Sequence, residues 1–142
     1  MDQTSKPLDT NALPWMPLTP GVAVRPLWLS GEERTIQLKV DPGCRIGPHR
    51  HSGPVHALTL SGCRRLASGD LAGPGAYVYE PEGNEDHWAC EGDEPVIVQI
   101  TMRGRVEYVG PDGAVISATD TGSLQRQFLD WCRQQGVTPY AL

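Results

Sequence analysis

The 142-residue sequence predicts an all-β sandwich or barrel followed by one C-terminal helix. Short apolar runs recur along the chain and are separated by turns rich in glycine and proline. Within several runs apolar and polar residues alternate, which is typical of half-buried strands. Helical three- and four-residue spacing appears only near the end of the chain. Many short strands and a single helix favour a β architecture whose outside the helix partly covers.

The clearest strand is predicted at residues 34–40, where Ile36, Leu38 and Val40 alternate with polar residues. A turn of the Asp-Gly kind at residues 110–113 predicts a hairpin between the last two strands. The remaining strands are predicted at residues 22–29, 55–60, 64–67, 77–80, 95–102, 105–109 and 114–118.

The helix is predicted at about residues 122–135, with Thr121 or Ser123 as its N-terminal cap and Gly136 at its end. Its apolar stripe consists of Leu124, Phe128, Leu129 and Cys132.

The N-terminal segment is predicted to be less ordered than the rest of the chain. Residues 1–13 are expected to form a flexible segment, and residues 14–142 a single domain. Residues 13–20 carry three prolines and several apolar side chains, which indicates an extended arm over a hydrophobic surface of this chain or of a neighbour. With open sheet edges, this arm suggests a homodimer.

Composition excludes several partner classes. A formal net charge of −5 argues against nucleic acid or an anionic membrane surface. No apolar run approaches the roughly 20 residues of a membrane span, and no signal-peptide pattern is present. The four cysteines are scattered and form no Cys-x-x-Cys pair, so they are interpreted as reduced thiols of a cytoplasmic protein.

Three of the four histidines lie between residues 43 and 62. His49 and His51 are two apart, so in an extended segment both side chains leave the same face. His87 ends a second turn-rich stretch at residues 75–87. We expect the two stretches to meet and to hold one divalent transition metal through His49, His51 and His87.

His56 is the candidate catalytic residue. It shares one face of its predicted strand with Leu58 and Leu60, so it faces the core if those leucines do. In that position His56 is a fourth metal ligand or a base facing the substrate, or simply a core histidine.

The first histidine stretch resembles the first cupin motif. Gly43, His49 and His51 match its glycine and its His-x-His pair. His56 takes the place of the motif's glutamate, and Gly62 closes the motif one residue early. In the second motif Gly75, Pro81 and Gly83 match, whereas His87 follows after three residues instead of two.

Residues 17–22, 49–56 and 72–81 are similar to the 2,4'-dihydroxyacetophenone dioxygenase-like cupins. The resemblance implies a double-stranded β-helix, or jelly-roll barrel, around a non-haem Fe(II) centre. It also implies dioxygenase activity, in which O2 cleaves a carbon–carbon bond beside the carbonyl of a small aryl hydroxyketone. By motif position, His49, His51 and His87 are the metal ligands.

The sequence departs from that group at residues 66–70, where the group's additional glutamate ligand is missing. The missing donor could be His56 or a carboxylate near His87, namely Glu80, Glu82, Glu85 or Asp86. Three histidine ligands do not determine which metal is bound, so Zn, Ni and Mn remain alternatives to Fe(II).

Two other functions stay open. One is a non-catalytic metal- or ligand-binding cupin, such as the sensors fused to anti-sigma factors. The other is a non-oxidative metal-dependent enzyme. Arg64 and Arg65 either anchor a substrate carboxylate or lie on a solvated strand face.

Overall fold

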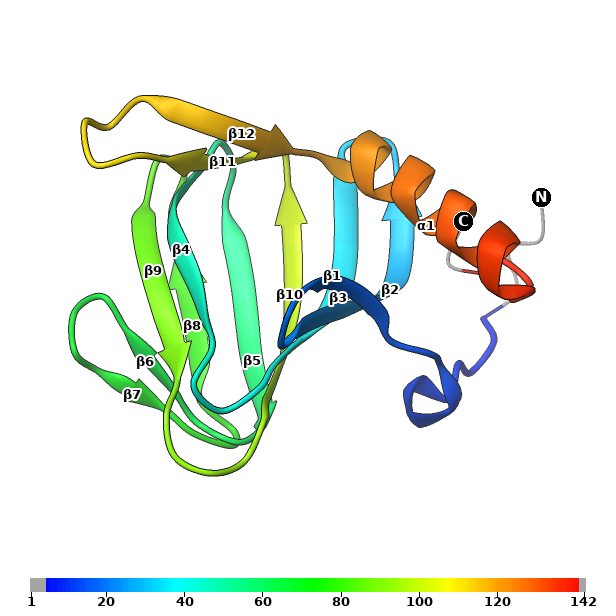
Figure 1. Ribbon diagram of the computed structural model, residues 1–142, viewed down its shortest axis with the longest axis horizontal. Helices are drawn as coiled ribbons and strands as arrows, with labels where there is room; N and C mark the ends of the chain where they lie inside the picture. Colours follow the sequence, from blue (N-terminus) through cyan, green and yellow to red (C-terminus); the bar gives the residue numbers. More distant parts are fainter. Residues whose placement is uncertain (1–4, 141–142) are drawn as a thin grey trace.

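The computed structural model describes residues 5–140, which form two facing antiparallel β-sheets and one helix (Figure 1). In spatial order the first sheet contains β1 (Met16–Thr19), β2 (Val22–Ser30), β3 (Glu33–Val40), β10 (Val96–Arg103), β5 (Val55–Ser61) and β8 (Tyr77–Glu80). The second contains β12 (Val115–Thr119), β11 (Val106–Val109), β4 (Arg45–His51), β9 (Glu85–Cys90), β6 (Arg64–Leu66) and β7 (Leu71–Ala72). The predicted all-β jelly roll with a C-terminal helix is confirmed.

The core lies between the two sheets. The alternation that predicts the strand at residues 34–40 sends Ile36, Leu38 and Val40 into this core from β3. β10 pairs with β3 on one side and β5 on the other, and its Val98 and Ile100 are buried with them. The apolar faces of both sheets therefore enclose one interior.

Helix α1 spans Thr121–Gln135 and packs beside the β1–β2–β3 end of the first sheet (Figure 1). Its N-terminal cap is Asp120 and not the predicted Thr121 or Ser123, because Asp120 and Ser123 exchange hydrogen bonds in a capping box, with Ser123 as the third helical residue. The predicted end at Gly136 is confirmed, and Gly136 has the positive φ of 70° that ends many helices.

Replacing Asp120 by alanine is expected to lower the free energy of unfolding by about 0.5–2 kcal/mol, because the amide of Ser123 loses its acceptor. Urea unfolding followed by circular dichroism measures the loss. Asp130→Ala is the matched control, since Asp130 makes only an exposed pair with Arg133. Equal effects of the two substitutions would contradict the role of the cap.

The proline-rich segment covers its own chain. Met16 in β1 is 1% exposed and pairs with Val24 of β2. Just before it, the guanidinium of Arg25 stacks on the ring of Trp15. The predicted flexible segment at residues 1–13 falls partly outside the described residues, and within it Thr10–Ala12 form a 3-10 turn, η1. The homodimer stays a prediction.

No helix within residues 5–140 has the length and apolar character needed to cross a membrane.

Candidate functional site

His49 and His51 lie on strand β4, and both side chains point into the barrel. Each is 5% exposed, and their rings meet edge to face with centroids 4.9 Å apart. β4 has a bulge between Ile46 and His49, after which His49 lies opposite Asp86 of β9 and Tyr108 of β11. The shared face expected of His49 and His51 is thus confirmed.

A cavity of about 130 Å³ lies between the sheets beside these two histidines. Its polar lining includes His49, His51, Glu80, Arg34, Arg64 and Tyr108. Most of the remaining wall is apolar and comes from both sheets: Val24, Ile36, Leu38, Ile46, Val55, Ala57, Trp88, Ile100, Met102 and Val106. Such a pocket, apolar with a few convergent polar groups, is the usual form of a small-molecule site.

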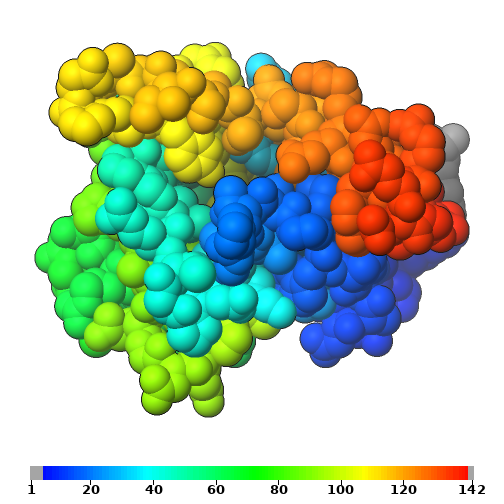
Figure 2. Space-filling view, in the orientation of Figure 1, coloured from blue at the N-terminus to red at the C-terminus, as the bar shows by residue number. Residues whose placement is uncertain are grey.

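The cavity reaches the surface between β1, the end of β12 and α1, where its lining residues Leu18, Thr119 and Gln127 are exposed. Figure 2 shows a recess on this face, between β1 in blue, α1 in orange and the yellow strands β11 and β12. A ligand could enter there without opening either sheet.

The ring of His49 is fixed by its own strand. Its Nδ1 lies 2.8 Å from the carbonyl oxygen of Gly47, which accepts only from a protonated nitrogen. Neutral His49 therefore carries its proton on Nδ1 and keeps the lone pair on Nε2. A histidine held in this way is ready to bind a metal through the second nitrogen.

Within residues 5–140, neither ring nitrogen of His51 has a hydrogen-bond partner. Its Nε2 lies 3.8 Å from Oε2 of Glu80, which is too long for a hydrogen bond, and its buried Nδ1 has no partner. Burial, with smaller effects of His49 and Arg34, lowers the pKa of His51 to about 4. At neutral pH the imidazole is uncharged, so its contact with Glu80 is not an ion pair.

Glu80 ends strand β8 and is the carboxylate that lines the cavity. It is 7% exposed, and its Oε1 accepts a 3.0 Å hydrogen bond from the side-chain amide of Asn84. Burial and the nearby charge of Asp86 raise the pKa of Glu80, while Arg64 and His49 oppose that shift. The other candidates on this segment, Glu82 and Glu85, are exposed.

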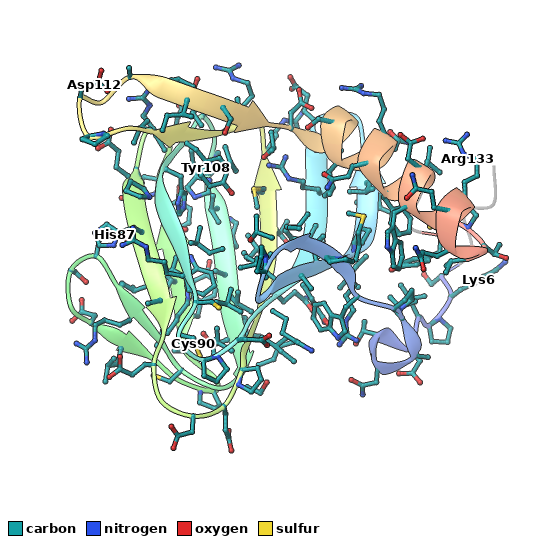
Figure 3. All side chains as sticks on the ribbon, viewed as in Figure 1. Lys6, His87, Cys90, Tyr108, Asp112 and Arg133 are labelled. Atoms are coloured by element: carbon teal, nitrogen blue, oxygen red, sulfur yellow. The ribbon has the colours of Figure 1, made fainter. Side chains whose placement is uncertain are left out.

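Arg34 and Tyr108 also line the cavity, Arg34 from β3 of the first sheet and Tyr108 from β11 of the second. Arg34 Nη1 donates to the carbonyl oxygen of Gly104 and to Oγ1 of Thr121, which ties β3 to the start of α1. Burial raises the pKa of Tyr108, so its phenol keeps its proton at neutral pH. Figure 3 labels Tyr108 on β11, near the recess.

The structure does not bring His87 to His49 and His51, which corrects the expected meeting of all three. His87 is exposed on the outer side of β9, whereas the next residue, Trp88, is buried in the core. Figure 3 shows the His87 side chain pointing away from the barrel. The residue opposite His49 is Asp86, whose Oδ1 accepts from the backbone amides of Ala67 and His87.

The expectation that His56 faces the core is wrong. Leu58 and Leu60, which share its face of β5, are 38% and 42% exposed, and His56 is exposed with them. Its ring hydrogen-bonds to the hydroxyl of Tyr77 on the outside of the first sheet. His56 is therefore remote from the cavity and has no part in the site described above.

Arg34 and Tyr108 line the cavity, although neither is predicted from the sequence as a site residue. The sequence pattern could have predicted Arg34, because residues two apart in a strand share a face and Arg34 therefore lies on the inward face of β3 with Ile36 and Leu38. For Tyr108 no such signal exists, since its strand β11 is only four residues long.

His49, His51 and Glu80 line one cavity, but their donor atoms do not surround a common point. Among residues 5–140, no three His, Cys, Asp or Glu side chains are arranged closely enough to hold a metal ion. Their chemistry nevertheless fits one, since two imidazoles and a carboxylate form a donor set of non-haem iron proteins. The unpartnered Nδ1 of the buried His51 also indicates a site that lacks a ligand in this arrangement.

Comparison with known proteins agrees with this fold. Residues 3–106 match the model of the ChrR cupin-like domain family. An RmlC-like cupin protein from Ralstonia eutropha superposes with a TM-score of 0.88 at 25% identity, covering 96% of this chain and 92% of that one. No curated protein matches the sequence.

Two further structures have names that state a function. Acetylacetone dioxygenase from Acinetobacter johnsonii superposes with a TM-score of 0.78 at 17% identity, over 92% of this chain and 93% of that one. The anti-sigma factor ChrR of Rhodobacter sphaeroides, in complex with SigE, gives 0.59 at 24% identity, over 66% of this chain and 51% of that one. At these identities both comparisons support the fold alone.

Proposed function

We propose that this chain, which belongs to the ChrR cupin-like family, is a metal-dependent dioxygenase that acts on a small carbonyl compound inside its barrel. The observation that carries the proposal is the convergence of His49, His51 and Glu80 on one largely apolar cavity. An uncharged buried imidazole and a buried carboxylate are what a metal centre needs, because protonated histidine cannot bind a metal.

His49, His51 and Glu80 are the proposed ligands, and Fe(II) is the proposed metal. Bound by two histidines and a carboxylate, Fe(II) supplies the capacity to activate O2. Glu80 takes the place of the glutamate that is missing after the first motif, and His87 is not required. Zn, Ni or Mn in the same donor set would favour non-oxidative chemistry.

The rest of the cavity is suited to hold a carbonyl substrate. The protonated phenol of Tyr108 can donate a hydrogen bond to a carbonyl oxygen. The apolar wall excludes water from the reacting atoms, which limits side reactions. A volume of about 130 Å³ is close to the roughly 150 Å³ of an apolar cavity that holds benzene, so it favours a short diketone or oxo acid over a substituted aryl ketone.

Oxygen uptake tests this function. Protein reconstituted anaerobically with Fe(II) is expected to consume O2 when acetylacetone or acetoacetate is added, and to consume less with the larger 2,4'-dihydroxyacetophenone. The double variant His49→Ala/His51→Ala should lose this activity, whereas His87→Ala should keep it. If uptake by the wild type needs neither iron nor the two histidines, the proposed dioxygenase is wrong.

A non-catalytic sensor is the second candidate, because the family model is that of the ChrR cupin-like domain and a ChrR structure shares this fold. A sensor would bind metal through the same residues but would consume no O2 with any of these compounds. Bound metal without turnover therefore favours the sensor.

A further inference from the structure

Arg64 is a buried cation that the proposed metal centre does not use. It lies in β6 opposite Cys90 of β9, and its side chain points into the barrel. It is 2% exposed, and its guanidinium carbon lies 5.0 Å from the centre of the Trp88 ring. The adjacent Arg65 is exposed and pairs with Glu91, so the two arginines play different roles.

Two of the donor atoms of Arg64 are buried without a partner. Nε and Nη2 make no hydrogen bond to any residue that the structure describes, although a guanidinium is charged in proteins even where burial lowers its pKa. These two N–H groups lie along the same edge of the planar guanidinium, where they form a fork that can donate in parallel to both oxygens of a carboxylate. Leaving such a fork empty inside a protein is costly, so its presence indicates a ligand.

No described side chain hydrogen-bonds to this fork. Among residues 5–140 no carboxylate forms an ion pair with Arg64, and the hydrogen bond from Asn84 holds Glu80 in its own position. Arg34 adds a second positive charge to the cavity wall, whereas Glu80 is the one carboxylate among the described residues that line the cavity. The cavity is therefore complementary to an anion.

We propose that Arg64 anchors the carboxylate of a small organic anion, which makes the substrate class a short oxo acid instead of a neutral diketone. The carboxylate accepts from Nε and Nη2 of Arg64, and the carbonyl end of the ligand extends along the apolar wall. The identification of this anion as a substrate rests on the proposed function, but its binding does not.

Acetoacetate and acetylacetone form a matched pair of probes. They have nearly the same size, and at neutral pH the first carries a carboxylate where the second carries an uncharged acetyl group. Isothermal titration of the full-length protein, both metal-free and loaded with Fe(II) under anaerobic conditions, measures the affinity for each.

Wild-type protein is expected to bind acetoacetate roughly 10- to 100-fold more tightly than acetylacetone, which is the range of a charged bidentate hydrogen bond. Arg64→Met keeps the length of the side chain and should erase this preference. Arg64→Lys keeps the charge without the fork and should retain only part of it. Arg65→Met, at an exposed position, should leave both affinities unchanged.

The proposal is overturned if acetylacetone binds as tightly as acetoacetate, if neither binds, or if a folded Arg64→Met protein retains the preference. Thermal melting of each variant shows which ones fold, and Arg64→Lys serves if Arg64→Met does not. Acetoacetate binding by protein that takes up no metal supports the anion site while contradicting the proposed enzyme. Metal-dependent O2 uptake with acetylacetone but not with acetoacetate supports the proposed enzyme while contradicting the anion site.

Discussion

His51→Ala is expected to lower the affinity for Fe(II) by more than about 100-fold, because even residues that only support a metal ligand contribute 10- to 100-fold. His51 brings a neutral imidazole with an unpartnered Nδ1 to the cavity lining. Anaerobic titration with a competing chelator measures the affinity.

Two matched variants make this result specific. His87→Ala removes an exposed imidazole and should leave the affinity unchanged. Glu80→Gln should weaken binding as His51→Ala does, whereas Asp86→Asn should change it by less than about tenfold, since Oδ1 of Asp86 already accepts from two backbone amides. A large loss in His87→Ala with none in Glu80→Gln would restore the three-histidine site that the motif predicts.

Phe128→Ala is expected to lower the free energy of unfolding by about 3–5 kcal/mol, the usual cost of removing a buried aromatic ring. Phe128 of α1 is 0% exposed and belongs to the hydrophobic core cluster. Its ring meets that of Tyr140 edge to face at 5.0 Å and stacks beside Trp131. Chemical denaturation measures the loss.

Leu71→Ala is the control for Phe128, since Leu71 is 56% exposed and its loss should change stability by no more than about 0.5 kcal/mol. A loss below about 1 kcal/mol for Phe128→Ala would mean that the helix contributes little to the fold, and the cavity mouth beside Gln127 would then be loosely held.

Periodicity alone predicts most of this fold. The alternation in β3 and the apolar run of β10 identify two central strands of the first sheet, and the spacing of Leu124 and Phe128 identifies the inner face of α1. β4 and β9 are harder to predict, because glycine, proline and charged residues interrupt them. They become strands through their mutual pairing, which is a tertiary effect.

His56 shows the limit of strand parity. Alternation establishes that His56, Leu58 and Leu60 share a face, but it does not establish which face is inside. In β5 the inward residues are the smaller Val55, Ala57 and Thr59, so the leucines are the outer set. Only the position of β5 against β10 and β8 decides this.

His87 shows the effect of one inserted residue. Because side chains in a strand alternate with a period of two, a shift of one position moves a residue to the opposite face. His87 follows Gly83 one residue later than the motif requires, and the structure places it outside. The departure from the motif was visible in the sequence, whereas the burial of Glu80 and Arg64 required the fold.

The location of the metal tests the account most directly. An anomalous-difference map from crystals of the wild-type protein loaded with Fe(II) or Zn shows where the ion lies. We expect one peak inside the cavity, in contact with His49, His51 and Glu80. A peak at His87 or among the cysteines, or no peak inside the barrel, would contradict the proposed centre.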